Sequence, residues 1–282
     1  MGALTPVFLF LLFLSAHSDE SSKLDSSCFS SIPISNSVTA LYVFGDSTVD
    51  AGNNNYVHKA ARANSLPYGI DFNNTPTGRF TNGKTIADFI AILYNLSLPP
   101  PYLSLKEAQR KTAMNGINYA SAGCGIFPNT KPTGVKYLQL FLLLVNSLNL
   151  IRGVHHGFRF DNLNRLLCRV LRCLRKLRVV WHDHAIQLST SQTLKNIQDE
   201  YPDATLTLAN SRDLLQDILA DTEKYGFTDV KDPRCGTYVN GELACIPNST
   251  PCDNRCQYLF FDASHTSEFA NCIFVRDMLI KD

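Results

Sequence analysis

The chain has 282 residues, of which 45% are hydrophobic and 18% charged, and its formal net charge is +1. This is the composition of a globular protein long enough for one large domain. A charge so close to balance gives no electrostatic reason to expect a nucleic-acid partner, so we expect none.

The chain opens with an apolar run over residues 7–14, which is followed by the small residues Ser15, Ala16 and Ser18. The pattern indicates a secretory signal peptide at 1–18, although no Lys or Arg precedes the apolar run. A membrane anchor is the alternative, but the run is well short of the ~20 residues that a spanning helix needs. We therefore predict a secreted, extracellular protein whose single domain occupies residues 19–282.

Strands and helices are expected to alternate after the leader. Residues 39–44 form a short β-favouring run that ends at Gly45, which predicts a buried strand. Residues 50–83 are dominated by Asn, Gly, Pro and Thr and predict a long loop. Residues 83–96 repeat apolar side chains at helical spacing, and Asp88 lies near their start, where an acid suits the helix dipole.

The same alternation continues further along the chain. Residues 116–127 begin as a strand and pass into a turn of small residues. Residues 204–209 predict another strand, and residues 212–226 predict a helix that ends at Gly226. This order of elements indicates an α/β domain built around a mostly parallel sheet.

Residues 135–185 interrupt this order. Eight basic residues lie between 152 and 178 against a single acid, Asp161, and leucines recur there at helical spacing. A basic amphipathic helix over 165–178 fits the pattern and could make peripheral contact with an anionic membrane surface or an acidic partner. The alternatives are a helix that covers one face of the sheet and the product of an altered transcript. Four histidines lie in this segment with only Asp183 as a carboxylate neighbour, so we expect no metal site at His155, His156, His182 and His184.

The nine cysteines and three glycosylation sequons agree with export. Four cysteines lie within 235–256, so in an oxidising compartment we predict one or two local disulfides there. A zinc site that uses Cys252 and Cys256 is the alternative, although it lacks a paired Cys-x-x-Cys knuckle. Glycosylated surface loops are predicted at the sequons Asn73, Asn95 and Asn248.

Gly45, Asp46 and Ser47 directly follow the first predicted strand. Ligands of an open parallel sheet bind beyond the carboxyl ends of its strands, so Ser47 lies where a nucleophile is expected. A serine hydroxyl needs a base to take its proton, and the base needs a group that orients it. Asp262 and His265 are three residues apart, a spacing that lets the carboxylate reach the imidazole. We predict Ser47, Asp262 and His265 as a catalytic triad; taken singly, a simple turn and a helix cap are the alternatives.

In these motifs the chain resembles the plant GDSL esterases/lipases of the SGNH hydrolase superfamily. The segment ALYVFGDSTVDAGNNNY is similar to that family's nucleophile block, and PTGRFTNGKTIADFIA and GINYASAGCGIF follow in the family order. The closing segments EYPDATLTLANSRDLLQDILADTEKYGF and YLFFDASHTSEFAN also resemble the family. Together the similar stretches cover roughly residues 38–130 and 186–276.

The resemblance implies a three-layer α/β/α sandwich that hydrolyses a carboxylic ester through an acyl-serine intermediate, without a cofactor or metal. Ser47 would be the nucleophile, His265 the general base and then acid, and Asp262 its orienting group. The implied oxyanion hole combines the N–H of Ser47, the N–H of Gly123 and an asparagine amide. A plain helix-entry glycine is the alternative for Gly123. The substrate would be a small-molecule or lipid ester.

Some family features are absent from this sequence. The Gly-x-Asn-Asp block that carries the oxyanion asparagine has no counterpart, and residues 135–185 stand in its place. Phe261 and Thr266 replace the usual Trp and Pro of the histidine block. We therefore expect one or two central strands to be missing and the activity to be impaired. A catalytically weak or dead relative that binds lipid or glycan, and a truncated product that does not fold, are the alternatives.

Overall fold

The computed structural model describes residues 38, 40–43, 45–58, 60–113, 115–123, 199, 211–235 and 244–280. Three expectations lie outside these residues: the leader at 1–18, the atypical segment at 135–185 with its basic stretch at 165–178, and the strand at 204–209.

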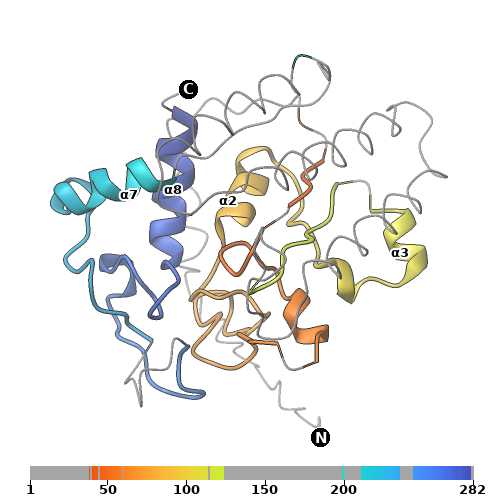
Figure 1. Ribbon diagram of the computed structural model, residues 1–282, viewed down its shortest axis with the longest axis horizontal. Coiled ribbons are helices and arrows are strands. Elements are labelled where there is room, and N and C mark those ends of the chain that lie inside the picture. Colours follow the sequence, from red (N-terminus) through yellow and green to blue (C-terminus); the bar gives the residue numbers. More distant parts are fainter. Residues whose placement is uncertain are drawn as a thin grey trace, which may run out of the picture.

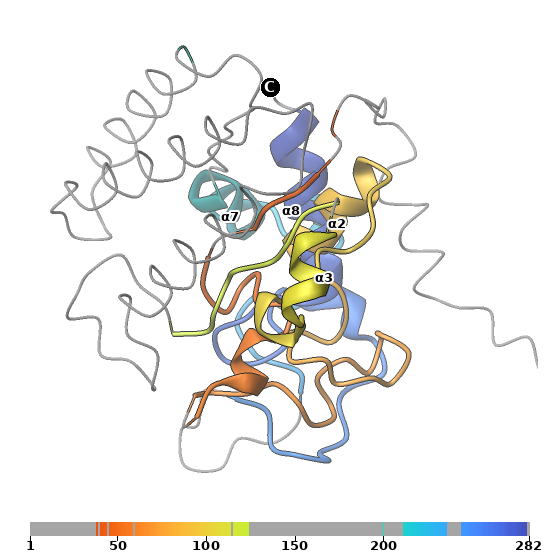
Figure 2. The same ribbon diagram turned by 90° about the vertical axis from the view of Figure 1, so that its right-hand side faces the viewer.

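Three extended segments pair in parallel near the centre of the described structure. Val43 forms a parallel bridge with Asn118, and Asn118 forms another with Pro101. The bridge is closed by hydrogen bonds from Val43 N to Ile117 O (3.1 Å) and from Tyr119 N to Val43 O (2.8 Å). The segment that contains Asn118 therefore lies between the other two. Figures 1 and 2 show it running beside the segment that contains Val43.

This arrangement agrees with the parallel pairing predicted for residues 39–44 and for the described part of 116–127. Within the described ranges, however, the pairing consists of isolated bridges and not of longer strands. The parallel α/β character is therefore visible, whereas the three layers of the predicted sandwich stay an expectation.

Helix α2 spans Ile86–Leu93, inside the predicted range 83–96. It begins there because Thr85 caps its first turn: the Thr85 side chain accepts the N–H of Asp88, and the Asp88 side chain accepts the N–H of Thr85. Asp88 also holds the buried Arg79 side chain through two hydrogen bonds of 2.7 Å. The acid predicted to favour the helix dipole is therefore also an anchor for the preceding loop.

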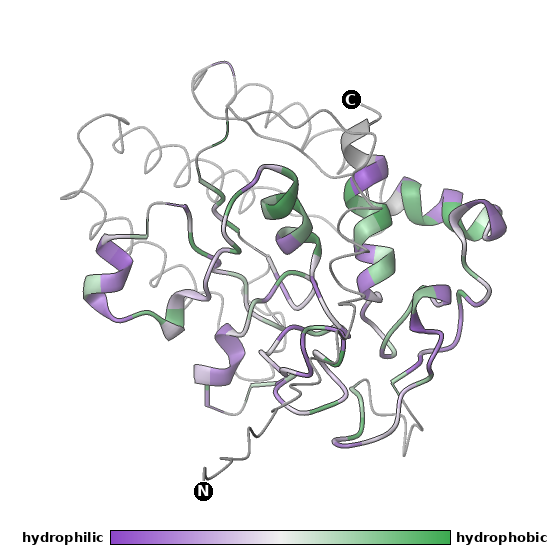
Figure 3. Ribbon diagram, turned by 180° about the vertical axis from the view of Figure 1, so that it is seen from behind, coloured by the Kyte–Doolittle hydropathy of each residue, from purple (hydrophilic) through white to green (hydrophobic). Residues whose placement is uncertain are grey.

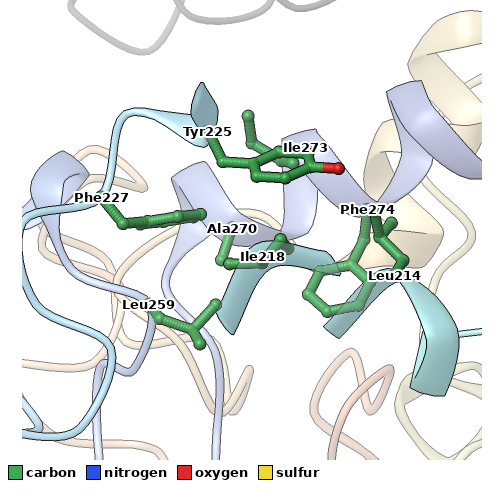
Figure 4. Packing of buried hydrophobic residues seen from close by; sticks show 8 residues of the cluster. All are labelled: Leu214, Ile218, Tyr225, Phe227, Leu259, Ala270, Ile273 and Phe274. Atoms are coloured by element: carbon green, nitrogen blue, oxygen red, sulfur yellow. The ribbon is translucent and has the colours of Figure 1, made fainter. Parts of the chain in front are cut away.

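Helix α8, Glu268–Ile280, packs against two helices that come from distant parts of the chain. Phe89 and Leu93 of α2 meet Cys272 and Val275 on one side of α8. Helix α7, Ser211–Ala220, contributes apolar side chains to a second cluster, which Figure 4 shows and which contains Leu214, Ile218, Tyr225, Phe227, Leu259, Ala270, Ile273 and Phe274. Helix α8 thus packs against both α2 and α7 through apolar side chains.

The predicted helix at 212–226 is divided in the structure. Helix α7 ends at Ala220, and a short 3-10 turn, η3, follows at Glu223–Tyr225. Gly226 then adopts a left-handed conformation with φ of 81°, which glycine reaches without steric cost. The glycine was correctly predicted as the stop, but the helix itself is shorter.

The remaining described helices are short. They are the 3-10 turns η1 (Asn53–Tyr56), η2 (Tyr102–Ser104) and η4 (Arg255–Gln257) and the helix α3 (Glu107–Lys111). Figure 3 shows that α3 is hydrophilic whereas α2 is largely hydrophobic, in keeping with the exposure of the first and the burial of the second. None of the helices in the described part of the chain is long and apolar enough to cross a membrane.

Candidate active site

The contact predicted between Asp262 and His265 is present. Nδ1 of His265 lies 2.6 Å from Oδ2 and 2.8 Å from Oδ1 of Asp262. The backbone N–H groups of Ser264 and His265 both donate to Oδ1 at 2.8 Å, so the turn after Asp262 folds around its carboxylate. Because a carboxylate only accepts hydrogen bonds, its short contacts with Nδ1 assign the proton of the neutral imidazole to Nδ1. The other ring nitrogen, Nε2, is then the one that can take a proton from a substrate or nucleophile.

Two aromatic residues from the long loop hold this pair in place. The hydroxyl of Tyr68 donates to Oδ2 of Asp262 at 2.6 Å. The ring of Phe80 lies against the His265 imidazole, with 4.9 Å between their centroids. Next to it, the Thr81 hydroxyl donates to the carbonyl of Thr266 at 3.0 Å, which fastens the loop to the chain beyond the histidine.

Ser47 lies in a tight turn directly after the first extended segment. The side chain of Asp46 accepts the N–H of Thr48 at 2.9 Å and its hydroxyl at 2.7 Å, which stabilises this turn. Gly45 accepts the N–H of Ser121 at 3.1 Å, so the turn starts beside the neighbouring parallel segment. Ser47 is half-buried, and it occupies the position after the strand at which the sequence predicted a nucleophile.

The asparagine run that follows Ser47 links its loop to residues 118–122. Asn53 donates to the carbonyls of Asn118 and Ala120 at 2.9 and 2.8 Å. Asn54 donates to the carbonyl of Ala122 at 3.0 Å and accepts the hydroxyl of Ser121. Side-chain amides suit this position because they donate and accept at once, and so they satisfy backbone groups that have been removed from water.

Asp50 also links the loop after Ser47 to residues 118–122, although no pattern in the sequence indicated this role. Its Oδ1 accepts the N–H groups of Gly52 and Asn53, both at 2.7 Å, and its Oδ2 accepts the N–H of Ala122 at 3.0 Å. Burial raises the pKa of Asp50 to about 6, although these N–H donors act in the opposite direction. Asp50 therefore ties the loop of the predicted nucleophile to the residue before Gly123.

The two halves of the predicted triad are joined indirectly. Among the hydrogen bonds of the described residues, none connects Ser47 to His265. Ala122, which Asp50 holds, belongs to one buried cluster with Phe80 and Phe261. Phe80 in turn lies against His265, so the loop after Ser47 and the histidine turn meet through a shared apolar contact.

Gly123, the predicted oxyanion glycine, follows Ala122 directly. It is exposed and has a φ of 80°, a left-handed conformation that favours glycine. The turn of small residues predicted within 116–127 is therefore present as far as Gly123, the last described residue of that range, and its role in catalysis stays a prediction.

The cysteine-rich loop contains one of the predicted disulfides. Cys235 and Cys245 are bonded to each other, while Cys252 and Cys256 are exposed free thiols. Cys272 is also disulfide-bonded. No group of three or more His, Cys, Asp and Glu residues could hold a metal ion in the described part of the chain. All three sequon asparagines are exposed and have positive φ, at Asn73, Asn95 and Asn248.

Comparison with known proteins supplies the family. The family model "GDSL-like Lipase/Acylhydrolase" matches residues 41–166, a span that reaches into the segment expected to be atypical. "GDSL esterase/lipase At1g71691" from Arabidopsis thaliana is 31% identical over 87% of this chain and 82% of the relative. "GDSL esterase/lipase At1g71250" from the same plant is 32% identical over 85% of this chain and 84% of the relative.

Both relatives are aligned over more positions than this chain has residues. The two alignments run over 320 and 315 residues, whereas the chain has 282, so each relative has positions that this chain lacks. The identity is nevertheless spread over most of both partners. On these grounds the chain belongs to the GDSL lipase/acylhydrolase family, whose members are carboxylic ester hydrolases.

Proposed function

We propose that this chain is a secreted serine esterase/lipase that hydrolyses carboxylic esters through an acyl-serine intermediate. The observation that carries the proposal is the paired Asp262 and His265, with Nδ1 within 2.6 Å of a fully buried carboxylate. A histidine held in this way presents one fixed tautomer, which is what a general base for a serine needs. Ser47 is proposed as the nucleophile because it directly follows the first extended segment, within the stretch that resembles the family's nucleophile block.

In the proposed reaction the Ser47 hydroxyl loses its proton to Nε2 of His265 as its oxygen attacks the ester carbonyl. Asp262 keeps the proton on Nδ1 and stabilises the imidazolium that forms. The N–H groups of Ser47 and Gly123 stabilise the negative charge on the carbonyl oxygen. His265 then gives its proton to the departing alcohol, and water repeats the sequence to release the acid.

We propose further that turnover is slow. The family block with the oxyanion asparagine has no counterpart in the sequence, and loss of one such donor costs about a hundredfold to a thousandfold in rate. The relatives' additional aligned positions support a missing segment. The same absence favours the second candidate, a non-catalytic relative that binds a lipid or glycan.

Secretion and glycosylation are part of the proposal. They rest on the apolar leader at 1–18, on the Cys235–Cys245 disulfide and on the exposure of Asn73, Asn95 and Asn248. Disulfides of this kind form in oxidising compartments. Peripheral membrane contact through 165–178 stays a prediction from the sequence.

Hydrolysis of p-nitrophenyl esters with short and long acyl chains tests the proposed function. The wild-type protein is expected to release nitrophenol, whereas Ser47→Ala and His265→Gln are expected to reduce the rate to background. Ser104→Ala, which removes an exposed hydroxyl, is the matched control and should keep the wild-type rate. Equal hydrolysis by Ser47→Ala and the wild type would overturn the proposal. A folded wild-type protein that binds esters without hydrolysing them would support the second candidate.

A further inference from the structure

The Asp262 carboxylate is held from two directions. Its Oδ1 accepts backbone N–H groups from its own turn, those of Ser264 and His265. Its Oδ2 lies 2.6 Å from Nδ1 of His265 and also accepts the hydroxyl of Tyr68 at 2.6 Å. The turn therefore holds Oδ1 through its backbone and Oδ2 through His265, while Oδ2 receives a second hydrogen bond from a side chain 194 residues away in sequence.

The direction of the Tyr68 hydroxyl proton is also determined. The backbone N–H of Cys245 points at the Tyr68 oxygen from 3.1 Å. An N–H can only donate and an ionised carboxylate can only accept, so the hydroxyl accepts from Cys245 and donates to Asp262. Tyr68 is 1% exposed and Asp262 is fully buried, and in such surroundings these hydrogen bonds are stronger than in water.

The surroundings keep the Tyr68 ring from moving. It packs edge-to-face with the rings of Phe80 and Phe261, with centroid distances of 6.0 and 5.8 Å. Cys245, the backbone donor, is buried and bonded to Cys235, and both belong to the same apolar cluster as Tyr68. The disulfide therefore holds Cys245, whose N–H donates to the Tyr68 hydroxyl, within the apolar cluster that surrounds the tyrosine.

We propose that Tyr68 is a positioning residue for ester hydrolysis, which acts by fixing the Asp262 carboxylate and through it the His265 imidazole. This inference rests on the proposed function, because it requires His265 to be the base. Without the hydroxyl, the carboxylate can turn about its Cβ–Cγ bond, and the imidazole loses its fixed direction toward Ser47. A displacement of about 1 Å between reacting groups can cost about a hundredfold in rate.

Tyr68→Phe tests the proposal because it removes the hydroxyl and keeps the ring that packs against Phe80 and Phe261. We expect kcat for p-nitrophenyl butyrate to fall about tenfold to a hundredfold while KM changes by less than about twofold, since the substrate is bound as before. Tyr225→Phe is the matched control: it also removes the hydroxyl of a buried tyrosine, but in the cluster between α7 and α8. It should keep the wild-type kcat.

A double-mutant cycle shows whether Tyr68 acts through Asp262. If it does, adding Tyr68→Phe to Asp262→Asn lowers kcat by less than about twofold, although the same change in the wild type lowers it about tenfold or more. An equal loss in both backgrounds would overturn the proposal. The Nδ1 proton of His265 gives a second readout, because its downfield NMR resonance should shift or broaden in Tyr68→Phe and not in Tyr225→Phe.

The failure of this proposal differs from the failure of the proposed function. Wild-type kcat in Tyr68→Phe, together with a strongly reduced kcat in Asp262→Asn and background activity in Ser47→Ala, overturns the role of Tyr68 alone. Undiminished activity of Ser47→Ala overturns both. If Tyr68→Phe does not fold, the double variant Cys235→Ser/Cys245→Ser tests the proposal instead. It keeps Tyr68 but removes the disulfide that holds residue 245, whose N–H donates to the tyrosine hydroxyl. A reduced kcat with unchanged KM supports the proposal, and wild-type kcat in that folded variant contradicts it.

Discussion

Glu268, at the start of α8, makes the stability of this protein depend on pH. The carboxyl is buried, its Oε1 accepts the N–H of Lys84 at 3.0 Å, and the Lys84 ammonium lies 3.4 Å away. Gly83 passes so close to the carboxyl that a side chain there would collide with it. Burial raises the pKa of Glu268 from the usual 4.5 to about 7, although the charge of Lys84 acts in the opposite direction.

The sign of the pH dependence follows from this shift. Between pH 4.5 and about 7 the folded state binds more protons at Glu268 than the unfolded state does. The free energy of unfolding therefore falls as the pH rises through this window. A pKa raised from 4.5 to about 7, at about 1.4 kcal/mol for each pH unit, corresponds to a loss of about 3 kcal/mol between pH 4 and pH 8.

Glu268→Gln removes the titration and keeps the shape of the side chain. Urea unfolding of the wild type and this variant at pH 4 and pH 8 measures the effect, and the variant should lose about 3 kcal/mol less than the wild type between the two pH values. Glu223→Gln, which changes an exposed glutamate, is the control and should follow the wild type. The same pH dependence in Glu268→Gln and the wild type would refute the reasoning.

Three further predictions concern other described contacts. Asp88→Asn leaves the buried guanidinium of Arg79 without its carboxylate and should lower the free energy of unfolding by about 3–5 kcal/mol; an unchanged urea midpoint would contradict this. Asp50→Asn replaces an acceptor of the Ala122 N–H and should lower kcat for ester hydrolysis about tenfold to a hundredfold; wild-type kcat would show that the link does not matter. Asn248→Gln should remove one glycan from the secreted protein, which intact-mass measurement detects; an unchanged glycan mass would exclude this site.

Local features of the fold and site could be predicted from the sequence. The three-residue spacing of Asp262 and His265 was enough to predict their contact, because a single turn brings such neighbours together. The position of α2 followed from its apolar repeat and from Asp88, whose capping contact is also local. Gly226 was predicted as a stop because its left-handed conformation is a property of the residue itself.

Contacts between distant segments could not be predicted in this way. Tyr68 meets Asp262 from 194 residues away, and nothing in the loop around Tyr68 indicates a partner for its hydroxyl. Arg79 was missed for a related reason: its ion pair with Asp88 crosses from a loop to a helix start, and no regular period connects the two. Such pairs depend on how the whole chain packs, which the apolar spacing within one segment does not encode.

The most direct test of the central claim is labelling by a fluorophosphonate probe, with the modified residue identified by peptide mass spectrometry. The probe reacts with a serine whose proton is taken by a base, so it reports the pairing of Ser47 with His265 even when turnover is slow. We predict that the wild-type protein is labelled at Ser47, and that Ser47→Ala and His265→Gln are not labelled. Labelling of the folded wild type at another residue, or equal labelling of His265→Gln, would contradict the account.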